Sequence, residues 1–240
     1  MNETSGGGRD LPIRGIVFDK DGTLFDFDAT WGGWCRGFIA AEAGGDAALT
    51  ARLAEALGYD LTAGAFHSHS IVIAATTDKV ADAILPLLPG QSKAAVLARM
   101  DARAMAADQV EVTPLLPLLT GLRGRGLKLG IATNDTEAPA RAHLGAAAVT
   151  QLFDFIAGFD SGFGGKPAPG QLRAFAAATG LPPQDCAMVG DSLHDLAAAR
   201  TAGMVAVAVL TGIAGREVLA PGADVVLASV ADLPGWLDSL

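Results

Sequence analysis

The chain has 240 residues, of which half are apolar, and a formal net charge of −9 at pH 7. This length and apolar content suffice for a buried core in one large or two modest domains. The acidic balance argues against a nucleic acid partner, because binding to a phosphate backbone requires a basic surface. No apolar run approaches the roughly 18 residues of a membrane helix, so we expect no membrane association.

The N-terminus is polar and glycine-rich and lacks the apolar stretch of a secretion signal, so residues 1–10 are predicted to form a flexible leader. The two cysteines, Cys35 and Cys186, lie far apart and lack metal-ligand spacing. These features predict a reduced, cytoplasmic protein. We expect a monomer or a homodimer.

Six short apolar runs, most of them continuous, are typical of strands buried on both faces of a parallel sheet. In chain order they are Ile13–Phe18, Leu127–Ala132, Phe155–Ala157, Ala187–Val189, Val205–Val209 and Asp224–Leu227. Helical patterns separate the later runs, over Thr136–Leu144, Gly170–Thr179, Leu193–Ala202 and Ile213–Ala220. This alternation predicts an α/β fold with a Rossmann-like, doubly wound parallel sheet.

The region between the first two strands is rich in Ala, Leu, Glu and Arg, with apolar spacing close to 3.6 residues. Its clearest predicted helices are Ala47–Leu57 and Ser92–Ala107. We therefore predict an all-helical cap over residues 27–110, inserted into an α/β core formed by residues 11–26 and 111–240. Pro114 is expected at the first position of the helix that returns the chain to this core.

Two carboxylates one residue apart, Asp19 and Asp21, follow the first predicted strand and precede Gly-Thr. Ligands of open α/β sheets bind at this end of the strands. Two acids so close repel each other unless a cation lies beside them, and Mg²⁺ prefers oxygen ligands of this kind. The pair can equally supply a nucleophile and a general acid/base. Because side chains alternate along a strand, Lys20 is expected to point away from both acids.

Two further features follow later strands. Thr133 and Asn134 fit either a helix cap or a phosphate site at a helix N-terminus. Lys166 lies in the Gly- and Pro-bounded turn Gly164–Pro169. A lysine with so little freedom suits a point charge aimed at a phosphoryl group.

Asp191 and Asp195 stand four residues apart at the start of a predicted helix. One acid in a first turn is favoured by the helix dipole alone. Two acids that converge with Asp19 and Asp21 would instead form a cation site. All of these features occur in order, each after a strand, and together they favour a functional site.

The pattern resembles the haloacid dehalogenase-like hydrolase superfamily over essentially the whole chain after the leader. Residues 19–24, Asp-Lys-Asp-Gly-Thr-Leu, match the family's first motif, Asp-x-Asp-Gly-Thr-Leu. Thr133 matches the second motif, Lys166 the third, and residues 190–195 the fourth. The chain is most similar to the phosphoglycolate phosphatase-like subgroup with a C1-type helical cap, because a helical insertion follows the first motif directly. The 32 residues between Thr133 and Lys166 leave little room for the larger cap that other subgroups insert there.

The resemblance implies a Mg²⁺-dependent phosphoric monoester hydrolase. Its substrate would be a small phosphorylated metabolite, phosphoglycolate-like or a sugar phosphate, hydrolysed through an aspartyl-phosphate. Asp19 would be the nucleophile and Asp21 the general acid and base. The metal would be held by the carboxylates of Asp19 and Asp191 and by the Asp21 carbonyl, with Asp195 in support. This subgroup usually has an apolar residue where this chain has Lys20.

By the same resemblance, Thr133, Asn134 and Lys166 would bind the phosphate. Specificity would lie in the cap, where Trp31 and Trp34 share a helix face and either pack in the cap core or contact substrate. Arg36, close to the hinge, is a candidate for contact with a substrate carboxylate or phosphate.

Three other readings remain open at this point. A phosphosugar mutase related to β-phosphoglucomutase shares the acids and a similar cap. A phosphonate hydrolase would require a cap lysine that forms a Schiff base, and Lys79 and Lys93 sit in no recognisable setting for it. A non-catalytic binding protein that keeps the fold is the third.

Overall fold

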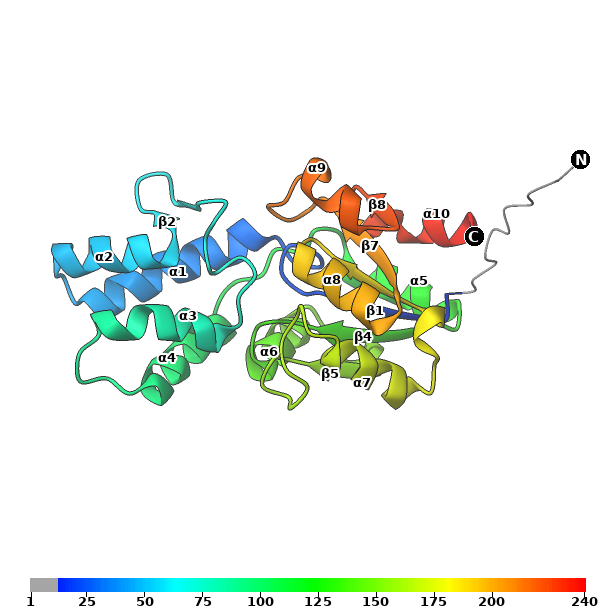
Figure 1. The fold of residues 1–240 in the computed structure, drawn as a ribbon, viewed down its shortest axis with the longest axis horizontal. Coiled ribbons are helices and arrows are strands. Elements are labelled where there is room, and N and C mark those ends of the chain that lie inside the picture. The colour runs from blue at the N-terminus through cyan, green and yellow to red at the C-terminus, as the bar shows by residue number, and fades with distance from the viewer. Residues whose placement is uncertain (1–12) are drawn as a thin grey trace, which may run out of the picture.

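The computed structural model describes residues 13–240, so the leader predicted over residues 1–10 lies outside the described residues. The chain forms an α/β core and a helical insert that projects from it on one side (Figure 1). No helix within residues 13–240 combines the length and the hydropathy needed to cross a bilayer.

Six parallel strands form the sheet of the core, in the order β5-β4-β1-β6-β7-β8. Their bounds are β1 Gly15–Phe18, β4 Lys128–Ala132, β5 Phe155–Ala157, β6 Cys186–Gly190, β7 Val205–Val209 and β8 Val225–Leu227. Strand β1 lies inside the sheet, where Gly15 aligns with Lys128 of β4 on one side and Cys186 of β6 on the other. The predicted doubly wound parallel sheet is confirmed.

Both faces of the sheet are covered. Along β1, Ile16 and Phe18 belong to one apolar cluster and Val17 to another, as expected from alternation along a strand. The first cluster includes α5 (Leu115–Gly124), α6 (Glu137–Ala146) and α10 (Leu233–Asp238), and the second includes α7 (Gly170–Thr179) and α8 (Leu193–Ala202). Burial on two faces explains why the strands are continuous apolar runs.

Two predicted helix starts in the core are wrong. The helix expected over Ile213–Ala220 is reduced to α9, Arg216–Leu219, because Gly215 is extended and stands before the first turn. Pro114 precedes α5 instead of occupying its first position. The carboxylate of Glu111 accepts the Leu115 N–H at 2.8 Å, and this bond sets the start of α5 one residue later.

The insert contains α1 (Phe27–Ala43), α2 (Ala47–Leu57), α3 (Thr77–Ile84) and α4 (Lys93–Met105), packed around an apolar core of their own. Helix α1 begins where Asp26 accepts the Ala29 N–H at 2.9 Å, and ends at Gly44, whose φ of 56° is left-handed. The prediction of an all-helical insert is wrong in one place. Strands β2 (Tyr59–Asp60) and β3 (Ala65–Phe66) pair across a tight turn that the Asp60 carboxylate closes.

The chain passes between core and insert through two adjacent segments. The Asp26 N–H donates to the Val110 carbonyl at 2.8 Å, and the Val112 N–H donates to the Leu24 carbonyl at 3.0 Å. The outgoing and returning segments therefore form a short two-stranded hinge.

Candidate active site

The chain turns sharply after β1 and exposes two acids at the carboxyl end of the sheet. The Asp19 N–H donates to the Val189 carbonyl of β6 at 2.9 Å, and the amides of Leu24 and Phe25 both donate to the Lys20 carbonyl. The turn requires a glycine at position 22, because its φ is 76° and a Cβ there would lie 2.4 Å from Asp191 Oδ2.

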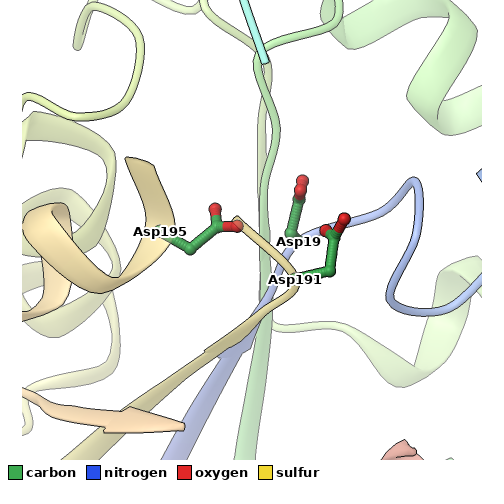
Figure 2. Close-up of side chains that lie close together, drawn as sticks. All are labelled: Asp19, Asp191 and Asp195. Atoms are coloured by element: carbon green, nitrogen blue, oxygen red, sulfur yellow. The ribbon is translucent and has the colours of Figure 1, made fainter. Parts of the chain in front are cut away.

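Three carboxylates converge at this point. Asp19, Asp191 and Asp195 each offer an oxygen within 4.8 Å of the other two (Figure 2). Asp19 follows β1, Asp191 follows β6, and Asp195 belongs to the first turn of α8, so residues distant in sequence meet because parallel strands end at one edge of the sheet.

Lys166 neutralises part of this charge. Its side chain is 2% exposed, and its Nζ lies 2.8 Å from Asp19 Oδ1 and 2.6 Å from Asp195 Oδ1. Burial alone would lower the pKa of Lys166, but the two carboxylates raise it above its ordinary value, so the side chain is a permanent cation.

The partners of Asp191 and Asp195 differ. Asp195 contacts Lys166 through one oxygen and accepts the N–H and hydroxyl of Ser192 through the other, in a capping box that begins α8. Asp191 accepts only the Thr23 hydroxyl, at 3.3 Å, among the bonds of the described residues. Asp191 therefore retains oxygens for a metal, whereas Asp195 holds Lys166 in place.

The titration of these acids fits a cation site. Burial raises the pKa of Asp19 to about 7, although Lys166 lowers it. Burial and the charges of Asp19 and Asp195 raise the pKa of Asp191 well above its ordinary value. Ionisation of all three carboxylates beside one ammonium is therefore unfavourable without a further cation, and their oxygens are the ligands that Mg²⁺ prefers.

Thr133 and Asn134 follow β4 on the other side of Asp19. The Thr133 hydroxyl accepts the Asp135 N–H at 3.1 Å, which leaves its own hydrogen free to donate to a phosphoryl oxygen. The Asn134 amide has a different task. It accepts the Lys166 N–H at 2.8 Å and donates to the carbonyls of Lys166 and Ala74, at 2.9 Å and 2.8 Å. Asn134 therefore fixes the Lys166 loop and ties it to the insert.

The expected orientation of Lys20 is wrong. Its side chain is fully buried, and its Nζ lies 2.7 Å from Asp21 Oδ1 and 3.6 Å from Asp135 Oδ2. Strict alternation applies to a strand, but β1 ends at Phe18 and Lys20 already belongs to the turn. Burial alone would lower the pKa of Lys20, and the two carboxylates raise it.

The same ammonium links the core to the insert. Lys20 Nζ lies 3.0 Å from His143 Nδ1 and 5.4 Å from the ring centroid of Trp31 on α1. Because an ammonium only donates, Nδ1 of His143 accepts and Nε2 donates to the Ala104 carbonyl of α4, at 2.6 Å. Burial and the adjacent Lys20 lower the pKa of His143 to about 4, so this ring is neutral near pH 7.

A cleft of about 670 Å³, part of it open to solvent, lies between core and insert above Asp19. Asp21, Thr133 and Lys166 line it from the core, and Trp31 and Trp34 from the insert. The two tryptophans also belong to the core of the insert, so packing in the cap core is confirmed, and their contact with substrate stays a prediction.

Arg36 does not reach the cleft. It is exposed on another face of α1, where its guanidinium lies beside Gly64. Sequence reasoning missed Asp101 and His194, which do line the cleft. The position of His194 inside the fourth motif is a signal that could have identified it. Asp101 is an isolated acid in α4, and no sequence motif marks it.

Residues 13–203 match the model of the haloacid dehalogenase-like hydrolase family. A phosphoglycolate phosphatase of Rhodospirillum rubrum is 37% identical over 122 residues, which cover 51% of this chain and 51% of that protein. A phosphoglycolate phosphatase of Xylella fastidiosa is 31% identical over 219 residues, which cover 90% of this chain and 87% of that protein. The chain therefore spans about half of the first relative and most of the second.

The fold is shared with a solved structure, a predicted phosphoglycolate phosphatase from Haemophilus somnus. The two structures superpose with a TM-score of 0.70 at 19% sequence identity, over 95% of this chain and 99% of the other.

Proposed function

The chain belongs to the haloacid dehalogenase-like hydrolase family, and from that premise we propose that it is a Mg²⁺-dependent phosphatase of a small phosphorylated metabolite. The observation that carries the proposal is the 2.8 Å contact between Lys166 Nζ and Asp19 Oδ1. It sets a fixed positive charge beside a carboxylate that has an open cleft in front of it, as a nucleophile for phosphoryl transfer requires. The names of the relatives from Rhodospirillum rubrum and Xylella fastidiosa support the same reaction class.

In the proposed reaction Asp19 attacks the phosphorus in line. A bond forms between its carboxylate oxygen and phosphorus, while the ester bond to the leaving oxygen breaks and that oxygen takes a proton from Asp21. Asp21 then removes a proton from the water that attacks the aspartyl-phosphate, which releases phosphate and restores Asp19. Thr133 and Lys166 hold the phosphoryl oxygens during both steps.

The carboxylates of Asp19 and Asp191, with the Asp21 carbonyl, would hold Mg²⁺, and Asp195 would keep Lys166 in position. A cation bound there would offset the repulsion between the acids and the phosphoryl group. Lys20 Nζ lies 2.7 Å from Asp21 Oδ1, and this contact fixes the orientation of the Asp21 carboxylate toward the cleft.

The test is release of inorganic phosphate from a panel of phosphomonoesters in the presence of Mg²⁺. Asp19→Asn should lower the rate about a thousandfold or more. The same substitution at Asp46, an exposed N-cap residue of α2, is the matched control and should leave the rate unchanged. Undiminished release by Asp19→Asn would refute the mechanism. A sugar phosphate that is isomerised without loss of phosphate would favour the mutase instead.

A further inference from the structure

The wall of the cleft that faces Asp19 is contributed by the insert, and it is mostly apolar. Helix α1 contributes Phe27, Trp31 and Trp34 to this wall, the segment before α3 contributes Val72 and Ile73, and α4 contributes Met100. A leaving group attached to a phosphate at Asp19 would lie against these side chains.

The insert places no cation on this wall. Residues 27–110 contain six lysines and arginines, and within the described chain none of the six lines the cleft. Arg99 is paired with Glu42 at 2.7 Å and Lys93 with Asp82 at 2.7 Å, both away from the cleft.

The one charged side chain that the described part of the insert does present to the cleft is an acid, Asp101. It is half-buried and accepts the Thr136 hydroxyl of the core at 2.8 Å. The lysine beside the reacting phosphate, Lys166, already faces Asp19 and Asp195. A carboxylate on the leaving group would lose its hydration, meet no unpaired lysine or arginine among residues 13–240 and face Asp101, which is unfavourable on each count.

We propose that the phosphate ester accepted by this cleft has an uncharged, predominantly apolar leaving group, and that 2-phosphoglycolate is a poor substrate. The inference rests on the proposed phosphatase function and adds the chemical class of the substrate. The predicted substrate class therefore differs from the phosphoglycolate for which the relatives are named.

The first experiment compares kcat/KM for three alkyl phosphates with Mg²⁺. They are benzyl phosphate, 2-hydroxyethyl phosphate and 2-phosphoglycolate, which all release a primary alcohol, so the comparison reports mainly on the leaving-group pocket. We expect benzyl phosphate to exceed 2-phosphoglycolate at least tenfold, with 2-hydroxyethyl phosphate between them. Equal or better hydrolysis of 2-phosphoglycolate overturns the inference and leaves the phosphatase proposal standing.

A binding measurement separates the inference from the proposed function. Benzylphosphonate and phosphonoacetate carry the two kinds of group on a bond that phosphatases do not hydrolyse, and calorimetry with the wild-type protein and Mg²⁺ compares them directly. Benzylphosphonate should bind at least tenfold more tightly. If no ester releases phosphate, the proposed function fails, and this ratio still decides the inference, because equal or reversed affinities overturn it.

Two variants test the residues that carry the argument. Asp101→Asn should raise the ratio of 2-phosphoglycolate to benzyl phosphate hydrolysis severalfold. Ile73→Ala should lower benzyl phosphate hydrolysis more than that of 2-hydroxyethyl phosphate. Leu116→Ala, on a side chain that is 47% exposed on α5, is the control and should change neither ratio. Unchanged ratios in both cleft variants would contradict the assignment of this wall.

Discussion

Replacing Lys20 by methionine should destabilise the protein strongly, and more so at alkaline than at acidic pH. Methionine fills most of the space of the lysine stem, so the loss is mainly electrostatic. The fully buried ammonium pairs with Asp21 at 2.7 Å and with Asp135 at 3.6 Å. Removing one partner of a buried ion pair costs about 3–5 kcal/mol, since the remaining charge stays buried and unpaired.

The pH dependence follows from Asp135. Burial raises its pKa to about 6 in the folded protein, and Lys20 lowers it. A carboxyl whose pKa is higher folded than unfolded binds protons on folding, so its contribution to stability falls as pH rises from about 4 through about 6. Without Lys20 the folded pKa rises further and this loss continues to higher pH. The difference between variant and wild type is therefore larger at pH 8 than at pH 5.

Urea unfolding of both proteins at pH 5 and pH 8 measures this difference. Lys79→Met, on the exposed side of α3, controls for the loss of a lysine as such and should change stability by less than about 0.5 kcal/mol. A loss below about 1 kcal/mol for Lys20→Met at pH 8, or a larger loss at pH 5 than at pH 8, would refute the reasoning.

Two further predictions concern the acidic cluster. Because the pKa of Asp19 is raised to about 7 and that of Asp191 well above its ordinary value, Mg²⁺ must displace protons. The affinity of the protein for Mg²⁺ should rise between pH 6 and pH 8, by up to about tenfold per pH unit for each displaced proton. Calorimetry in two buffers of different ionisation enthalpy should detect the released protons. A Mg²⁺ affinity independent of pH would contradict this prediction. Gly212→Ala should weaken Mg²⁺ binding about tenfold or more, because a Cβ there would lie 1.8 Å from Asp191 Oδ2 and must displace that carboxylate. Gly121→Ala is the control, because its added Cβ would meet no atom within 4 Å apart from its chain neighbours and the backbone of its own helix. Equal Mg²⁺ affinities in the two variants would show that Gly212 does not position Asp191.

Much of the core could be predicted because its signals are local. The continuous apolar strands and the acids that follow them identify the sheet, its buried faces and the edge at which Asp19 and Asp191 meet. Parallel pairing then brings these residues together without knowledge of any long-range contact. The sequence alone is sufficient for this part of the site.

The remaining features depend on contacts between distant segments. The orientation of Lys20 could not be predicted, because the strand ends two residues before it and its partner Asp135 follows another strand. Arg36 lies close to Asp19 in sequence, but the rotation of α1 turns it outward. Asp101 reaches the cleft only because α4 packs against α6, and no local pattern marks it.

The paired hinge has an evolutionary consequence. The outgoing segment at Asp26 and the returning segment at Val110 are hydrogen-bonded neighbours, so the two ends of the insert lie close together, like the ends of a long loop. All residues proposed to act on phosphorus, from Asp19 to Asp191, stand outside the inserted segment. In the proposed function, the reaction and the choice of leaving group are thus encoded in separable stretches of the gene, so substitutions within one can explore new substrates while the other preserves the chemistry.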